Sequence, residues 1–188
     1  MAGHSVLQLP VPALEEWVLA RTRHHDASFV SDDPRFGHAH VTALGPFDPS
    51  PSPQALAEVG AIAVRTQPIR VTFGRLGQFP DGIIHLVPEP DTALRGLTAM
   101  LVEAFPEFPP YGGRFGEGVA PHLTLDAASA EVSLASTARL LGAVVPVTCT
   151  LDELQLAWWE SGHCHVQHRW TLGARARRPW KDHVRGDG

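Results

Sequence analysis

The stretch "GHAHVTALGPF", residues 37–47, places three polar side chains in a short apolar run. His38, His40 and Thr42 follow one another at intervals of two residues. Because residues two apart in a strand point to the same face, these three side chains would share one face, while Val41 points into the core. A buried strand avoids polar groups unless they have partners or a role. The spacing therefore indicates a strand with one functional face.

The same pattern returns in the second half of the chain. "HVTAL" at residues 40–44 is matched by "HLTLD" at residues 122–126. One His-x-Thr pattern alone means little, but both copies have an apolar middle residue, and both lie in a predicted strand between a loop and a helix. The chain therefore reads as two related halves, each with one central His-x-Thr strand.

Two such strands can build a site for a phosphodiester. If the halves pack about a pseudo-twofold axis, two imidazoles and two hydroxyls meet in one cleft, from His40, His122, Thr42 and Thr124. A neutral imidazole can take a proton from the attacking water or hydroxyl, and a protonated one can give a proton to the leaving oxygen. The hydroxyls can hold the nonbridging oxygens and stabilise developing charge. This chemistry requires no metal and no other cofactor.

Composition and periodicity point to an α+β fold. The chain has 188 residues, of which 44% are hydrophobic and 19% charged, as in an ordinary globular domain. Helical periodicity is found over residues 12–23, 50–67, 91–105 and about 130–141. Strands are predicted over residues 4–11, 37–44, 69–77, 82–89 and 119–126, with two or three more between residues 145 and 173. The irregular alternation with hairpin-like pairs favours a mostly antiparallel sheet over a doubly wound parallel one.

Charge and targeting signals narrow the class of partner. The net charge of −5 and the pI near 6.1 argue against an extended surface for nucleic acid, although a small local positive site is compatible with them. The first residues do not read as a signal peptide, and no run of about 18 apolar residues predicts a membrane span. We expect a cytoplasmic monomer, with one bilobal domain over residues 1–173 and a basic, flexible tail over residues 174–188.

The two motifs resemble those of the 2H phosphoesterase superfamily, which includes 2′-5′ RNA ligase-like proteins and cyclic phosphodiesterases. The resemblance rests on "HVTALGPF", with its Gly after the motif, and on "PHLTL", with its Pro before it, and it covers roughly residues 4–172. It implies two pseudo-symmetric halves, with antiparallel sheets around a central groove and helices outside. It also implies that His40 and His122 are the acid/base pair and that Thr42 and Thr124 bind phosphate.

The function that the resemblance implies is metal-independent cleavage of a small phosphodiester, such as the 2′,3′-cyclic phosphate of a nucleotide or of an RNA end. Two alternatives use the same cleft: 2′-5′ RNA ligation, and noncatalytic binding of a nucleotide or another phosphorylated ligand. The G-x-G-x-x-G and G-x-x-x-x-G-K loops are absent, so nucleotide binding through either of them is unsupported.

One position departs from the family pattern. Many RNA ligase-like members have a basic residue soon after the second motif, where this chain has Asp126 and Ala127. The departure argues against a long RNA substrate. Asp126 shares a strand face with His122 and Thr124, so it could lie at the cleft edge, but we favour a role in capping the next turn.

Further candidates lie around the two motifs. Arg114 and Phe115 precede the second motif, where a guanidinium could hold a phosphate and a ring could stack on a base, with an ordinary surface loop as the alternative. His38 could contact substrate or orient a catalytic group, or it could lie at the solvent end of its strand. His85 reads as a strand residue. Trp158-Trp159 reads as one core and one surface residue rather than a stacking platform.

The segment "HCHVQH", residues 163–168, invites a zinc interpretation because His and Cys are zinc ligands. In a strand, however, His163 and His165 share one face, while Cys164 and His168 share the other. The four side chains cannot converge without a bend, so we expect no metal site.

Overall fold

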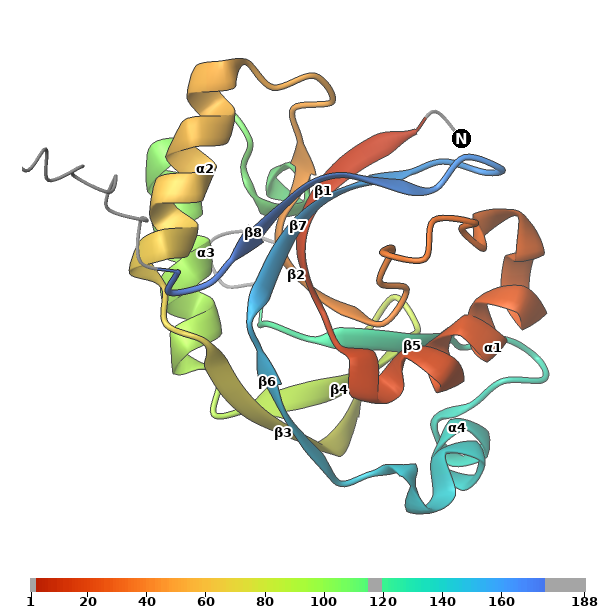
Figure 1. The fold of residues 1–188 in the computed structure, drawn as a ribbon. Coiled ribbons are helices and arrows are strands. Elements are labelled where there is room, and N and C mark those ends of the chain that lie inside the picture. Colours follow the sequence, from red (N-terminus) through yellow and green to blue (C-terminus); the bar gives the residue numbers. More distant parts are fainter. Residues whose placement is uncertain (1–2, 115–119, 175–188) are drawn as a thin grey trace, which may run out of the picture.

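The computed structural model describes residues 3–114 and 120–174 (Figure 1). Its strands are β1 (His4–Pro10), β2 (His40–Phe47), β3 (Ile69–Gln78), β4 (Ile83–Glu89), β5 (Leu123–Ala127), β6 (Val147–Leu151), β7 (Glu153–Trp159) and β8 (His165–Thr171). Its α-helices are α1 (Glu15–Asp26), α2 (Pro53–Arg65), α3 (Thr92–Ala104) and α4 (Leu134–Leu141). The strands form one curled, antiparallel sheet in the order β6-β3-β4-β5-β2-β1-β7-β8.

The sheet consists of two halves that meet between β2 and β5. One half holds β2, β1, β7 and β8, and the other holds β5, β4, β3 and β6. The chain order β1-α1-β2-α2-β3 is repeated as β4-α3-β5-α4-β6. Helices α2 and α3 lie side by side against β8 and β2, whereas α1 and α4 lie toward β5 and β3 (Figure 1). This arrangement confirms the predicted α+β fold with two pseudo-symmetric halves.

Apolar rows on the helices fix them to the sheet. In α2, the Ser52 hydroxyl accepts the N–H of Ala55 at 3.1 Å, and Pro53 occupies the first turn. Val59 and Ile62 of the same helix are buried. The row predicted for residues 91–105 is buried as Leu94, Leu97 and Leu101 of α3. These rows close over a core that includes Val41 and Leu123, the middle residues of the two motifs.

Several predicted element boundaries were wrong by a few residues. The helical pattern predicted over residues 12–23 ends too early, because α1 continues to Asp26, and the imidazole of His25 contacts Asp126 on β5. The strand predicted over residues 37–44 starts later, at His40. The helix predicted from about residue 130 begins only after Ser133, which forms a reciprocal capping box with Ser136. Tertiary contacts and local capping interactions determine where these helices and strands begin and end.

The predicted basic tail, residues 174–188, lies almost entirely outside the described residues. Its flexibility and the domain boundary at residue 173 therefore stay predictions. Within the described ranges, no helix is both long and apolar enough to cross a bilayer.

Candidate active site

The two His-x-Thr motifs lie on neighbouring antiparallel strands at the centre of the sheet. The register pairs Val41 of β2 with Leu123 of β5. Continuing this register places His40 opposite Thr124, and Thr42 opposite His122, at the close spacing of cross-strand neighbours. We call His40 and Thr42 the first arm, and His122 and Thr124 the second arm. A local twofold axis through the Val41–Leu123 pair relates the arms.

The imidazoles of both arms are held by the same backbone contact. His40 Nδ1 lies 2.9 Å from the carbonyl oxygen of His38, and His122 Nδ1 lies 3.0 Å from that of Ala120. A carbonyl oxygen only accepts hydrogen bonds, so Nδ1 must carry the proton in each ring. In the neutral ring Nε2 therefore keeps its lone pair. Each arm thus presents a nitrogen that can take up or give a proton.

Burial lowers the proton affinity of both imidazoles. Burial lowers the pKa of His40 to about 4, and the nearby His122 acts in the same direction. Burial also lowers the pKa of His122, and the nearby His85 contributes to that shift. Both rings are therefore predominantly neutral at pH 7 without ligand. A phosphate anion between them would favour the protonated form of either ring.

Two cavities meet at the arms. A cavity of about 520 Å³ is lined by His40, Thr42 and Thr124. A second cavity, of about 730 Å³, is lined by Ala120 and Pro121, the two residues before His122, although His122 itself lines neither. Both cavities share Thr42, Gly45 and Tyr111 in their walls. Their volumes lie in the range of small-molecule sites.

Tyr111 joins the two arms and was not singled out from the sequence. It lies in a short 3₁₀ turn (Pro110–Gly113) and has a φ of 52°, in the left-handed region that disfavours a side chain. Its hydroxyl shares a hydrogen bond with Thr42, and its ring lies parallel to that of His122 at 6.2 Å. Burial raises the pKa of Tyr111, so the phenol keeps its proton near neutrality. The sequence "PPYGGRF" contains no pattern that predicts the contacts of Tyr111 with Thr42 and His122.

Trp159 forms the wall beside His40. The centroids of the two rings are 5.1 Å apart, and Trp159 lines the smaller cavity. Its indole N–H donates to the side chain of Gln8 at 2.9 Å, and Gln8 in turn donates to the Gly37 carbonyl at 2.9 Å. Trp158 and Trp159 are both half-buried, so neither is the core residue that was predicted for this pair.

The surroundings of His122 are aromatic. Phe79 meets the ring of His122 edge-on at 4.8 Å and stacks on His85 at 4.0 Å. His85, on β4, is only 6% exposed, and its ring centre is 5.4 Å from that of His122. Gly77 leaves room for it, because a Cβ there would lie 2.6 Å from His85 Nε2. His85 is thus a strand residue, as predicted, and it packs beside the second arm.

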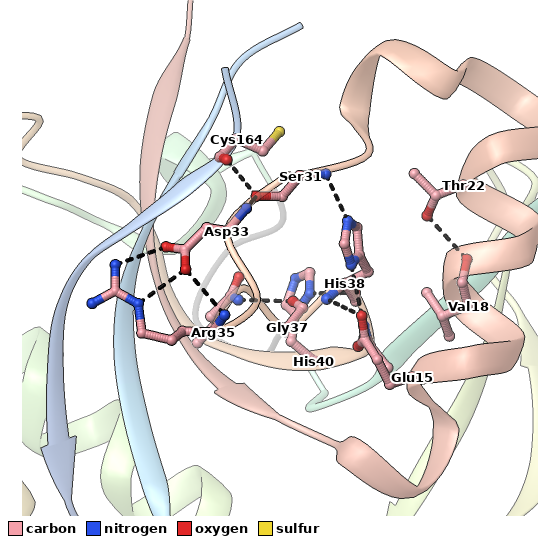
Figure 2. Close-up of polar contacts among 12 residues, drawn as sticks. Glu15, Val18, Thr22, Ser31, Asp33, Arg35, Gly37, His38, His40 and Cys164 are labelled. Atoms are coloured by element: carbon pink, nitrogen blue, oxygen red, sulfur yellow. Dashed lines mark hydrogen bonds and ion pairs between the residues drawn. The ribbon is translucent and has the colours of Figure 1, made fainter. Parts of the chain in front are cut away.

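His38 lies behind His40 rather than at the solvent end of the strand, so that alternative was wrong (Figure 2). The side chain is 4% exposed. Nδ1 lies 2.6 Å from Glu15 Oε1, and Nε2 accepts the backbone N–H of Ser31 at 3.1 Å. His38 lines the smaller cavity, but both of its ring nitrogens are occupied by protein groups, so neither is left to bind a substrate.

Asp126 is a buried anchor, and its preferred interpretation as a turn cap was wrong. Its carboxylate is 2.7 Å from Arg21 Nε and 2.8 Å from His25 Nε2, and it accepts the Thr137 hydroxyl at 2.5 Å. Burial alone would raise its pKa, but these hydrogen bonds together keep the pKa below its ordinary value. The partners come from α1 and α4, which the sequence could not place beside β5.

Arg114 and the segment "HCHVQH" take no part in the walls of the two cavities. Arg114 is exposed and lines neither cavity, and Phe115 lies outside the described residues. The rings of His163 and His165 are 4.7 Å apart, whereas Cys164 is buried and its thiol donates to the Glu160 carbonyl. In the part of the chain that the structure describes, no group of three or more His, Cys, Asp and Glu residues could hold a metal ion.

The family model of the 2′-5′ RNA ligase superfamily matches residues 10–163, which include both arms. The chain belongs to this superfamily. The match confirms the resemblance to the 2H phosphoesterases that the two motifs indicated. Members of the superfamily are phosphoesterase-like and ligase-like proteins.

Several solved structures share the fold. Escherichia coli LigT complexed with 3′-AMP is 18% identical and gives a TM-score of 0.56, with 91% of this chain and 98% of LigT covered. The Thermus thermophilus protein TT0787 is 17% identical and gives a TM-score of 0.60, with 92% of this chain and 100% of TT0787 covered. At these identities the similarity concerns the fold alone. The search of curated proteins returned no match.

Proposed function

We propose that this chain hydrolyses a small phosphodiester, such as the 2′,3′-cyclic phosphate of a nucleotide or of an RNA end, with His40 and His122 as the acid/base pair. The observation that carries the proposal is the facing of the two arms across the Val41–Leu123 pair. Each imidazole is fixed through Nδ1, which leaves Nε2 for proton transfer. In-line displacement at phosphorus needs one base and one acid, and the two rings can supply both.

In the proposed reaction the phosphate lies between the arms. The hydroxyls of Thr42 and Thr124 donate to its nonbridging oxygens and stabilise the charge that develops on them. The neutral imidazole takes a proton from water as the water oxygen bonds to phosphorus. The protonated imidazole gives its Nε2 proton to the ribose oxygen whose bond to phosphorus breaks. The product is a nucleoside monophosphate, and exchange with solvent restores the two protonation states.

The groups around the cleft favour a reaction without a metal ion. The arms offer N–H and O–H groups, which suit the oxygens of a phosphate directly. Two carboxylates near the arms already have protein partners: Glu15 binds His38 and Ala39, and Asp126 binds Arg21, His25 and Thr137. Cations prefer such carboxylate oxygens as ligands, and here these oxygens are occupied.

The size of the cleft and the net charge favour a small substrate. LigT has been crystallised with 3′-AMP, ATP, NADP+ and phosphate, all of which are small phosphorylated compounds. The cavities beside the arms have volumes suited to such a ligand. The net charge of −5 disfavours a long polyanion.

Both arms come from one chain, so the cleft is complete in a monomer. The proposal therefore includes a monomeric working unit of residues 1–173, and we propose the cytoplasm as its location. A shortened chain ending at residue 173 should elute as a monomer from a sizing column and retain full activity. A loss of activity on removal of the tail would contradict this part of the proposal.

The test is an assay with 2′,3′-cyclic nucleotides and with an RNA oligonucleotide that ends in a cyclic phosphate, each with and without EDTA. We expect monophosphate products at the same rate in both conditions, with a bell-shaped dependence of kcat/KM on pH. Joined oligonucleotides in place of hydrolysed ones would favour 2′-5′ ligation. Binding of nucleotides without turnover would favour a noncatalytic module, and neither binding nor turnover would refute the proposal.

A further inference from the structure

Glu15, the first residue of α1, reaches into the segment before the first arm (Figure 2). Its Oε1 accepts the backbone N–H of His38 at 3.2 Å and lies 2.6 Å from His38 Nδ1. Its Oε2 accepts the backbone N–H of Ala39 at 2.8 Å. One carboxylate thus receives three hydrogen bonds from the two residues that precede His40. Burial alone would raise the pKa of Glu15, but these contacts outweigh it and lower the pKa, so the group is ionised at pH 7.

The His38 ring can bind only an acceptor at the position of Glu15. Its Nε2 faces the Ser31 backbone N–H, which can only donate, so Nε2 must accept. The Ser31 segment is itself held, because its hydroxyl donates to the Cys164 carbonyl at 2.5 Å and accepts the Asp33 N–H at 3.0 Å. Nδ1 of the neutral ring therefore carries the proton and donates to Glu15. A carboxylate accepts from this ring and from both backbone N–H groups, whereas the NH₂ of a side-chain amide would face one of these donors.

The same contacts orient the group that holds His40. The N–H of Ala39 and the carbonyl of His38 belong to one planar peptide group, and they point to opposite sides of it. Glu15 accepts from the N–H side, while the carbonyl accepts from His40 Nδ1 on the other side. The orientation of this peptide, and with it the direction of the His40 ring, is therefore tied to the Glu15 carboxylate.

The second arm lacks an equivalent contact for a covalent reason. The peptide group whose carbonyl holds His122 joins Ala120 to Pro121, and proline has no N–H to donate. The pyrrolidine ring restricts the backbone at that point instead. A carboxylate can therefore bind the N–H of this peptide group in the first arm but not in the second.

We propose that Glu15 and His38 are positioning residues that fix the tautomer and the direction of the His40 imidazole. The proposal rests on the function assigned above, because it concerns a ring that takes part in that reaction. Neither residue need touch the substrate. Their effect is expected on the rate of the chemical step rather than on binding, since a small misplacement of a catalytic group lowers kcat strongly.

The central variant is Glu15→Gln, which keeps the size of the side chain. Its amide offers one acceptor and one donor against three donors, so one donor must face another in either orientation. The matched control is Glu16→Gln, which removes the same charge from an exposed position next to it. We expect kcat for a 2′,3′-cyclic nucleotide to fall about 30-fold in Glu15→Gln, with KM changed less than about twofold, and to stay unchanged in Glu16→Gln.

A second pair of variants tests His38 without relying on Glu15. In His38→Asn the side-chain amide can still donate to Glu15 from the place of Nδ1, whereas His38→Ala removes the contact. We expect the Asn variant to retain more than half of the wild-type kcat and the Ala variant to lose about 30-fold. Circular dichroism establishes that each variant is folded.

Nitrogen NMR of ¹⁵N-histidine-labelled protein provides a readout that does not depend on turnover. The wild-type protein should show His40 as the single Nδ1–H tautomer, and Glu15→Gln should show a mixture or the other tautomer. An unchanged His40 tautomer together with an unchanged kcat in Glu15→Gln would overturn the positioning role. If the wild-type protein has no hydrolytic activity, the proposed function fails, and the tautomer measurement alone then decides the positioning role.

Discussion

The two arms present the same imidazole arrangement but are supported in different ways. In both, an imidazole Nδ1 donates to the carbonyl two residues earlier, at 2.9 Å for His40 and 3.0 Å for His122. Behind His40 lies a hydrogen-bonded pair, Glu15 and His38. Around His122 lie the rings of Phe79, His85 and Tyr111. Trp159 also lies beside His40, so the first arm differs from the second in the polar network behind its imidazole.

Helix α1 connects the two supports. Its first residue, Glu15, binds the segment before the first arm, and Arg21 and His25 near its end bind Asp126, two residues after Thr124 on the strand of the second arm. A single rigid element therefore contacts both sides of the cleft. Changes at either end of α1 should affect one arm more than the other, and the following experiments use this difference.

The largest expected effect is the loss of either imidazole. His40→Ala and His122→Ala should each lower kcat about 10³-fold, because each removes one of two proton-transfer groups. The double variant should be about as slow as either single variant, since the pair acts as a unit. His163→Ala, with a side chain 71% exposed and away from the cleft, is the control and should match wild type. Retention of more than a tenth of the activity in either arm variant would show that this arm is dispensable.

The anchor of the second arm should dominate stability. Asp126→Asn should lower the free energy of unfolding by about 3 kcal/mol, because it leaves Arg21 and Thr137 without a full set of acceptors in a buried place. The control is Asp91→Asn, whose ion pair with Arg95 has the same 2.7 Å distance but is exposed. That change should alter stability by less than about 0.5 kcal/mol. Urea denaturation of both variants measures the difference, and equal effects would contradict it.

The burial of His40 predicts that stability falls in acid. Its pKa is about 4 in the folded chain and 6.5 in an unfolded one, so protons bind the unfolded chain more readily between these values. As the pH drops from 6.5 toward 4, this group should remove about 3 kcal/mol from the free energy of unfolding. In His40→Asn, whose amide can still reach the His38 carbonyl, most of that loss should vanish. Denaturation series at several pH values test this, and an unchanged pH dependence in the variant would contradict the burial argument.

The hydroxyls of the arms should have a smaller effect on rate than the imidazoles. Thr42→Val and Thr124→Val keep the side-chain shape and should each lower kcat about 10²-fold, as expected for loss of one donor to the developing charge. Thr42→Val also removes a hydrogen bond to Tyr111, so Tyr111→Phe is needed to separate the two contributions. Thr72→Val, in a hydroxyl pair on β3 and β6 outside the cleft walls, should leave the rate unchanged. Unchanged rates in both threonine variants would show that these hydroxyls do not stabilise the developing charge.

The sequence was sufficient to predict the arms and the fold class. Strand geometry placed His40 with Thr42 and His122 with Thr124, because side chains alternate between the faces of a strand whatever surrounds it. The buried leucines of α3 follow from helical spacing alone. These features depend on neighbours within a few residues, so a local pattern suffices.

The supports of the arms could not be predicted, because their partners are remote in sequence. Asp126 binds Arg21, which is 105 residues away. Nothing in the sequence around Asp126 indicates that contact. Glu15 looks like any acidic residue in the first turn of a helix, a position that such residues favour for other reasons. Tyr111 reaches Thr42 only through a left-handed backbone conformation that the sequence does not specify. Each of these residues was overlooked or given the wrong role because its contacts are with residues far away in the sequence.

The central claim is that both arms act on one phosphate. The most direct measurement is a titration of ¹⁵N-histidine-labelled protein with 3′-AMP, a compound seen bound to LigT. If the claim holds, the Nε2 resonances of His40 and His122 shift together with one dissociation constant, while that of His163 stays in place. A shift of only one of the two, or of neither at saturation, would contradict it.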